Sequence, residues 1–298
     1  MSGTNQHAST ADQGRRLAEV LGCDVQPEAA GGESRTFRLV GTDDLVTVPL
    51  AWPDATEPAA DLTRRTTLQE RVADRVAVPV PRLVRLVPDA GLAVVRRLPG
   101  TRLIDVPRRL DPAVVRRVAA TVGTLLAELH TWAPDAYEDV ADVDDHSPAE
   151  WRDEAADLAV EVAAVLTDRQ REDVRRFLDR PTPGPASELR LSHNDLGIEH
   201  VLVAPAGEVT GVIDWDDAAI CDPAYDFGLL LRDLGPEALD VALTAYAEAG
   251  GSPVEYVERA RFYARCTLLE DLAFGHSEGR SVYVDKSLAA WAWTFSPH

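Results

Sequence analysis

Residues 191–228 read LSHNDLGIEHVLVAPAGEVTGVIDWDDAAICDPAYDFG, with acidic and histidine side chains between short apolar runs. The runs 201–203 and 209–213 predict the two strands of a hairpin joined by a glycine turn. Such a hairpin places Asp195 and Asp214 on loops at its two ends. One carboxylate can then accept a proton from a hydroxyl group while the other binds a metal ion.

Length and composition favour a globular protein with two lobes. The chain has 298 residues, 45% of them hydrophobic, which suffices for two packed cores. It contains no apolar run of about 18 residues, so we expect no membrane partner. The first sixteen residues lack an apolar signal region, and we expect them to form a frayed lead-in. Three widely spaced cysteines fit a reducing, cytoplasmic location.

The charge balance bears on the choice of ligand. The formal net charge is −20, which argues against nucleic acid because its phosphates need a basic surface. An acidic cleft would attract a cationic ligand, although acidic surfaces also simply keep proteins soluble. Lys286 is the only lysine, so arginine supplies nearly all the positive charge.

The first hundred residues predict a small, strand-rich lobe. Strand-like composition occurs at 36–40, 45–50, 76–87 and 91–98, with turn signals between these segments. A helical pattern covers 61–76. Together these elements predict a small mixed sheet with one helix.

The rest of the chain predicts a larger, mainly helical lobe after a hinge at Leu98-Pro99-Gly100. Helix-start signals recur along this part, at Asp111-Pro112, Ser147-Pro148-Ala149-Glu150, Pro236 and Ser252-Pro253, and a last helix is expected from Ser281 to Phe295. The predicted class is therefore α+β, with a β-rich lobe over residues 1–97 and a helical lobe over 98–298.

The ordered motifs of residues 193–226 resemble those of the aminoglycoside phosphotransferase family, which has a bilobal, protein-kinase-like fold. The matching motifs, in chain order, are His193-Asn194-Asp195, His200, Ile213-Asp214-Trp215 and Asp222-Pro223-Ala224-Tyr225-Asp226. Several spaced matches in the right order are far more specific than one glycine motif.

The resemblance implies a role for each matching residue. Asp195 would be the catalytic residue that orients or deprotonates the acceptor hydroxyl. Asp214 would bind the Mg²⁺ that bridges the nucleotide phosphates, and His200 stands where the family usually has a metal-binding asparagine. His193 and Asp226 would brace the catalytic loop. Two alternatives remain open: His200 as a packing residue, and the cluster around it as a metallohydrolase centre, although turn residues disrupt the spacing that zinc would need.

The small lobe departs from the family pattern at its phosphate-binding position. Thr47 stands where the third strand should carry a basic residue, and the only lysine is distant in sequence. We expect an arginine to replace it, with Arg65 favoured and Arg64, or Arg35 beside Gly31-Gly32, as alternatives. Two alternatives remain open: that these arginines are surface residues, and that the chain is a non-catalytic, drug-binding pseudokinase.

The nucleotide and the acceptor are also expectations from the resemblance. The hinge strand, with Val95 and Arg97, would offer its backbone to the purine of ATP or GTP, and the sequence does not distinguish the two. Carboxylates on helices would pair with a cationic antibiotic, at Glu270, Asp271, Asp153 and Glu154. The segments 193–203 and 212–235 most resemble kinases of cationic cyclic peptides of the capreomycin and viomycin type. Phosphorylation of such a drug would confer resistance; aminoglycoside and macrolide acceptors are the alternatives.

Overall fold

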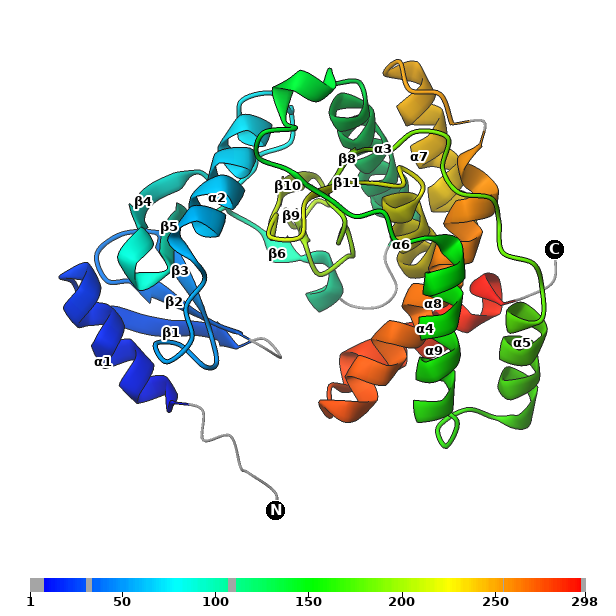
Figure 1. The fold of residues 1–298 in the computed structure, drawn as a ribbon, viewed down its shortest axis with the longest axis horizontal. Coiled ribbons are helices and arrows are strands. Elements are labelled where there is room, and N and C mark those ends of the chain that lie inside the picture. The colour runs from blue at the N-terminus through cyan, green and yellow to red at the C-terminus, as the bar shows by residue number, and fades with distance from the viewer. Residues whose placement is uncertain (1–7, 31–33, 107–110, 254, 296–298) are drawn as a thin grey trace. The chain divides into compact units, whose positions relative to one another are not determined.

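The computed structural model describes residues 8–30, 34–106, 111–253 and 255–295 and comprises two compact units (Figure 1). The first unit consists of Met1–Asp74 and Val80–Leu98, and the second of Arg75–Pro79 and Pro99–His298. A strand-rich first unit and a mainly helical second unit confirm the predicted α+β class. In the described part of the chain, no helix is both long and apolar enough to span a membrane.

The first unit is built on one antiparallel sheet in the order β1-β2-β3-β5-β4. The expected turn at Gly31-Gly32 lies outside the described residues. The elements of this unit are α1 (Thr10–Leu21), β1 (Val25–Ala30), β2 (Ser34–Leu39), β3 (Asp44–Pro49), α2 (Ala59–Ala73), β4 (Leu83–Val87), a short 3₁₀ turn (Pro88–Ala90) and β5 (Leu92–Arg96).

The expectation of a frayed lead-in over residues 1–16 is wrong for residues 10–16, which belong to α1, while residues 1–7 lie outside the described residues. Ser9 caps the helix, and Leu17 and Leu21 are buried with Phe37 in the core of this unit. The buried amide of Gln13 donates hydrogen bonds to the carbonyl oxygens of Pro49, Leu50 and Trp52. The helix is therefore held by its apolar face and by one polar side chain, which composition alone does not reveal.

The strand expected over 76–87 is also much shorter in the structure. Only Leu83–Val87 pairs with β5, and residues 76–82 form no strand. Pro79 and Pro81 lack the backbone N–H groups that hydrogen bonding between strands needs. Val78 and Val80 are therefore buried without belonging to a strand.

The second unit holds seven helices and six short strands among its described residues. They are β6 (Thr101–Arg102), α3 (Pro112–His130), β7 (Asp142–Val143), α4 (Pro148–Glu161), α5 (Asp168–Leu178), β8 (Arg190–Ser192), β9 (Val201–Val203), β10 (Val209–Val212), β11 (Ala219–Cys221), α6 (Tyr225–Leu234), α7 (Pro236–Glu248), α8 (Tyr256–Ser277) and α9 (Ser281–Thr294), with 3₁₀ turns at Leu103–Asp105 and Pro134–Ala136. The predicted cap at Asp111 and capping box at Ser147 are present.

Helices α4, α5, α6, α8 and α9 share one apolar core, which contains Tyr225, Leu268 and Trp291. Close contact between α6 and α8 requires Gly228, because a Cβ there would lie 2.8 Å from the Cβ of Tyr263 and 2.9 Å from a backbone oxygen. This packing fixes α6 and α8 as rigid supports for the loops described next.

Two small sheets carry those loops. The predicted hairpin is present, with β9 and β10 antiparallel and β6 added beside β9. The other sheet has the order β7-β11-β8. The segment between β8 and β9 contains Asp195 and His200, and Asp214 follows β10.

Candidate active site

The loop between β8 and β9 is held by a buried carboxylate. Asp226, on the first turn of α6, accepts backbone N–H bonds from His193 at 3.0 Å, from Asn194 at 3.3 Å and from Leu196 at 3.3 Å. Burial raises the pKa of this carboxyl to about 6, while the three N–H groups favour the carboxylate. Asp226 therefore connects a rigid helix to a loop that lies some thirty residues earlier.

His193 is buried beneath the loop. Its Nε2–H donates to the carbonyl oxygen of Ile213 at 3.0 Å, and its ring lies 4.6 Å from that of Trp215. Burial, followed by the nearby charge of His200, lowers the pKa of His193 to about 3. A neutral ring that joins the 193–200 loop to the end of β10 is a structural link between the two parts of the site.

His200 lies between the two predicted functional carboxylates. Its Nδ1 donates to the carbonyl oxygen of Asp195 at 2.7 Å and lies 3.4 Å from a carboxylate oxygen of the same residue. Its Nε2 lies 3.5 Å from a carboxylate oxygen of Asp214. The structure thus brings Asp195, His200 and Asp214 together, because the loop before β9 and the loop after β10 lie at the same open end of the antiparallel hairpin.

Backbone conformation supports the assignment of both loops as functional. Asn194 and Asp214 have φ angles of 63° and 65°, in the left-handed region that residues with a Cβ rarely adopt. Among the described residues these are the only non-glycine positions of this kind; Asn194 directly precedes Asp195 in the chain, and Asp214 lies beside His200. Such conformations persist where the surrounding structure enforces them, often at active sites.

The three side chains influence one another's protonation. Burial raises the pKa of the Asp195 carboxyl to about 8, which the charge of His200 opposes; water access to a side chain that is 43% exposed moderates this rise. Burial disfavours charge on His200, but Asp195, Asp214 and Glu199 outweigh it and raise its pKa. Each of the two carboxylates, when it is ionised, therefore favours the charged form of His200.

These residues suit Mg²⁺ in one specific way. The described residues contain no group of three or more His, Cys, Asp or Glu side chains arranged as a metal cage. Mg²⁺ commonly uses one or two carboxylates together with substrate phosphates, and the Asp214 side chain, 51% exposed, fits such a role. His200 would serve as a ligand only after losing its Nε2 proton, which its raised pKa opposes.

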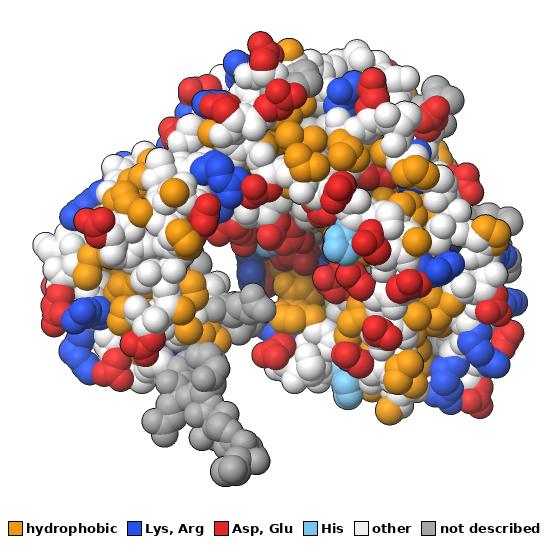
Figure 2. Space-filling view, in the orientation of Figure 1, with side chains coloured by type: hydrophobic (Ala, Val, Ile, Leu, Met, Phe, Trp, Pro, Cys, Tyr) orange, Lys and Arg blue, Asp and Glu red, His pale blue; other side chains and the backbone are white. Residues whose placement is uncertain are grey.

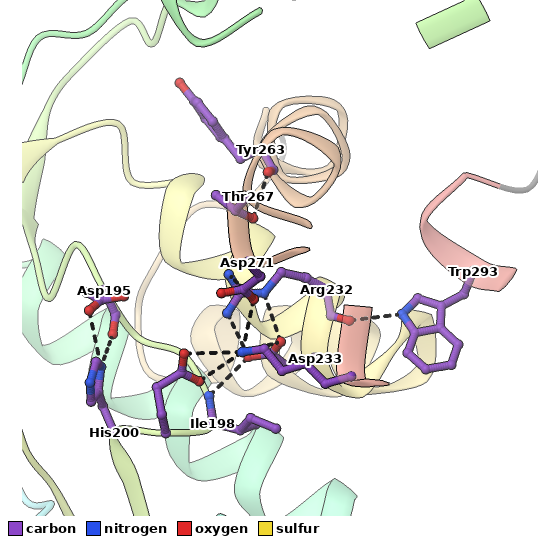
Figure 3. Close-up of polar contacts among 11 residues, drawn as sticks. Asp195, Ile198, His200, Arg232, Asp233, Tyr263, Thr267, Asp271 and Trp293 are labelled. Carbon is purple, nitrogen blue, oxygen red and sulfur yellow. Dashed lines mark hydrogen bonds and ion pairs between the residues drawn. The ribbon is translucent and has the colours of Figure 1, made fainter. Parts of the chain in front are cut away.

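A buried ion cluster supports the other side of the same loop, and sequence reasoning missed it. Its carboxylates are Glu199, Asp233 and Asp271, and its cations are Arg232 and Lys286 (Figure 3). The signal in the sequence was the single lysine of the chain, Lys286, in a protein whose other long basic side chains are all arginines.

Helices α4 and α8 border a cavity of about 290 Å³. It is lined by Trp151, Glu154, Ala155, Asp157, Leu158, Cys266 and Glu270. Reduced hydration, and then the charges of Asp271, Glu154 and Asp217, raise the pKa of Glu270. An aromatic ring beside several carboxylates forms a site suited to a cation.

Two of the four carboxylates predicted for the acceptor do not lie in this cavity. The Asp271 carboxylate points to the buried cluster, 2.9 Å from Arg232 and 3.0 Å from Lys286. Asp153 is exposed and pairs with its neighbour Arg152 at 3.0 Å. Neighbouring residues on a helix point about 100° apart. For this reason Glu270 faces the cavity while Asp271 faces the cluster, and Glu154 lines the cavity while Asp153 faces solvent.

The cavity and the loop belong to one acidic region of the second unit. Asp217 raises the pKa of both Asp195 and Glu270, and the Tyr225 ring lies 5.1 Å from that of Trp151. Acidic side chains also gather on the visible face of this unit (Figure 2). Acidic side chains therefore lie close together from the cavity to the loop that holds Asp195, an arrangement that attracts cations.

In the first unit, the exposed side chain of Thr47 lies on the sheet face opposite to buried Val46 and Val48. Arg35 pairs in register with Val48, on the α1 side, where it donates to Ala8 and Gln13. Arg35 and Thr47 thus lie on opposite faces, since successive side chains of a strand alternate. Arg35 does not fit the place of the missing basic residue.

The remaining nucleotide candidates are also placed. Arg65 donates from Nε and a terminal nitrogen to both carboxylate oxygens of Glu57, at 3.2 and 2.8 Å. Val95, on β5, pairs with Leu45 and Leu83. Arg97 follows β5 and contacts Glu28 at 2.8 Å.

The fold agrees with comparisons to known proteins. A family model described as "Phosphotransferase enzyme family" (APH) matches residues 24–263. Viomycin phosphotransferase of Streptomyces vinaceus is 32% identical over 162 residues, which are 53% of this chain and 56% of that protein. The match to YcbJ of Bacillus subtilis, also 32% identical, covers 44% and 43%. The chain thus aligns with about half the length of these relatives.

Solved structures are similar along nearly the whole chain. A macrolide 2'-phosphotransferase of Brachybacterium faecium has 26% identity and a TM-score of 0.62, covering 95% of this chain and 98% of that one. The GDP complex of aminoglycoside 2'-phosphotransferase-IIIa has 18% identity and a TM-score of 0.68, covering 96% and 98%. The fold is therefore kinase-like.

Proposed function

Because this chain belongs to the phosphotransferase enzyme family, we propose that it transfers the γ-phosphoryl group of ATP or GTP to a hydroxyl of a cationic antibiotic. The observation that carries the proposal is the placement of Asp195 and Asp214 on either side of His200, on two loops braced by Asp226 and His193. Phosphoryl transfer requires mainly positioning and charge stabilisation, and two carboxylates on fixed loops supply both.

Each residue has a proposed part in the reaction. The Asp195 carboxylate accepts or orients the proton of the acceptor hydroxyl, and the raised pKa suits a group that must hold that proton. Asp214 would hold Mg²⁺, which when bound neutralises charge on the nucleotide phosphates. The region of Val95 and Arg97 would contact the purine, and Arg65 the phosphates. His200 is a second metal ligand when neutral and a bridge between the carboxylates when protonated.

The proposed acceptor is a cyclic peptide of the viomycin or capreomycin type. The acidic cavity lined by Glu154, Glu270 and Trp151 supports a cationic drug, and one relative is a viomycin phosphotransferase. Solved relatives include complexes with aminoglycosides, which are also cationic, so an aminoglycoside is the second candidate. A large apolar macrolide fits a small carboxylate-lined cavity less well.

The decisive experiment measures nucleotide consumption with ATP or GTP and Mg²⁺ across viomycin, capreomycin, kanamycin and erythromycin. We expect drug-dependent turnover with the cyclic peptides, and a phosphorylated drug detectable by mass spectrometry. Asp214→Ala serves as the inactive control. Turnover only with erythromycin would contradict the acceptor class. Drug binding without any nucleotide consumption would instead identify a non-catalytic drug-binding protein.

A further inference from the structure

Five charged side chains meet behind the catalytic loop, and all are nearly buried. Glu199 belongs to the loop, Arg232 and Asp233 to the end of α6, Asp271 to α8 and Lys286 to α9. None of these side chains is more than 11% exposed. Figure 3 shows three of them, Arg232, Asp233 and Asp271, pointing toward one another beside Ile198.

Stability alone gives a weak reason for such a cluster. Removing charges from water costs several kcal/mol per ion, and buried ion networks often stabilise no better than apolar packing of similar volume. What they supply is fixed geometry, because a misplaced partner leaves a buried charge uncompensated. A cluster of this kind next to a catalytic loop therefore points to a positional role.

Lys286 lies at the centre of the cluster. Its Nζ is 3.1 Å from Glu199, 3.0 Å from Asp271 and 3.4 Å from Asp233. Burial and Arg232 oppose its charge, but the three carboxylates outweigh them and hold its pKa above the ordinary value. An ammonium has three donors around one point, whereas a guanidinium is a larger planar fork, so lysine suits three converging carboxylates. All other basic residues of the chain, 30 in total with Lys286, are arginines.

The cluster contacts the loop backbone directly as well as through Glu199. Asp233 accepts the N–H of Ile198 at 3.0 Å. A Cβ on Gly197 would lie 2.5 Å from the Glu199 carboxylate and 3.0 Å from Arg232, so a larger residue there would have to displace these two charged groups of the cluster. Ile198 and Glu199 lie between the catalytic Asp195 and His200 in the chain. By holding Ile198 and Glu199, the cluster fixes the distance between Asp195 and His200.

We propose that Lys286 is a positioning residue that holds the 195–200 loop in register through Glu199 and Asp233. The effect on catalysis rests on the proposed phosphotransferase function, whereas the effect on loop order does not. Lys286 and Asp271 lie beyond residues 24–263, which the family model matches, so this brace is supplied by the C-terminal helices of the chain itself. Trp293 fastens the same helix to α6 by donating to the Leu231 carbonyl oxygen at 2.9 Å.

The single lysine makes a direct test possible. Labelling with ¹³C,¹⁵N-lysine gives one side-chain NMR signal for the whole chain, because no other lysine exists. We expect a charged ammonium whose protons exchange slowly with water and whose shift changes in Glu199→Gln. A rapidly exchanging signal typical of an exposed lysine would overturn the proposal.

The Glu199→Gln variant separates positioning from folding. It leaves Asp233 and Asp271 to bind Lys286, so we expect the chain to fold. Hydrogen exchange at the Ile198 and His200 amides should accelerate about 10-fold as the loop loosens. The kcat should fall about 10- to 100-fold with the KM values for nucleotide and drug changed less than about twofold.

Two further variants complete the design. Lys286→Arg should reproduce the loosened loop, because a guanidinium does not fit the same three carboxylates. Phe177→Leu in the α5 part of the core should lower stability but leave loop exchange and kcat unchanged. If Lys286→Arg matches the wild type, or Phe177→Leu loosens the loop equally, the positioning role is wrong. Faster loop exchange in an enzyme that phosphorylates no drug would support the brace and contradict only the proposed function.

Discussion

The imidazole of His200 donates from Nδ1 to the carbonyl oxygen of Asp195 at 2.7 Å and lies beside the carboxylate of the same residue. A protonated ring in this place lowers the pKa of a carboxyl that burial raises. The pair therefore sets the pH at which the proposed base becomes available.

Replacement of His200 by glutamine should shift the pH profile of kcat/KM. Asp195 must be ionised to accept a proton, so activity falls as pH drops through its pKa. Loss of the His200 cation raises that pKa further, and the acidic limb should move to higher pH at saturating Mg²⁺. His276→Gln, an exposed histidine on α8, is the control. An unmoved limb with a higher Mg²⁺ requirement would instead identify His200 as a metal ligand.

The same histidine predicts a pH dependence of stability. Its pKa is raised in the folded state, so its contribution is complete below about pH 6.5, the ordinary histidine value, and is lost as pH rises through the higher folded value. Denaturant unfolding of wild type and His200→Gln should therefore converge toward alkaline pH. A difference that grows with pH would contradict the assigned charge.

Replacement of Asp195 by asparagine should lower kcat by about 10²-fold or more, since positioned acid–base groups contribute about 10²–10⁴-fold. Unfolding should change little, because the side chain is 43% exposed. Steady-state kinetics and thermal unfolding check both expectations, with exposed Asp240→Asn as the control. Near-normal turnover would exclude Asp195 as the base.

Asp226→Asn should destabilise the protein and disorder the loop. The two carboxylate oxygens accept three backbone N–H groups. An asparagine has only one side-chain oxygen, and its NH₂ group would face at least one of these backbone N–H groups. An unsatisfied buried group costs about 1–3 kcal/mol, which denaturant unfolding can measure. Unchanged stability would show that the loop does not depend on this brace.

Glu270→Gln should raise the KM for viomycin about 10-fold, the equivalent of one lost charge-assisted hydrogen bond, with a smaller change in kcat. The salt dependence of kcat/KM should also weaken, because exposed charges are screened over about 8–10 Å at ~0.1–0.15 M. Glu161→Gln, exposed on the same α4 that borders the cavity, is the control. Equal effects of both variants would indicate general charge attraction rather than a specific contact.

Arg65→Ala should weaken nucleotide binding without affecting drug binding, if its guanidinium reaches a phosphate. Glu57 now holds that guanidinium, so Glu57→Gln should leave nucleotide binding equal or stronger by releasing it. Isothermal titration calorimetry with the nucleotide and with the drug measures both affinities in each variant, with Arg16→Ala on α1 as the control. Normal nucleotide binding by Arg65→Ala would direct attention to Arg64.

The sequence alone determined the α+β class, the hairpin of residues 201–213 and the flanking loops of Asp195 and Asp214, whereas the expectation for His200 came from the family resemblance. These features follow from local patterns, because alternation, turn residues and loop spacing act over a few residues. Helix α1 was missed because Gln13 and Leu17 gain their partners only from strands and turns far along the chain.

Only the tertiary structure decided which surroundings each of two adjacent side chains faces. Glu270 lines the acceptor cavity while Asp271 enters the buried cluster, and Arg35 lies on the sheet face opposite Thr47. The cluster itself unites Glu199 with Lys286 across 87 positions of the chain. No local pattern encodes such a meeting, because the desolvation and attraction that govern it depend on which helices pack together.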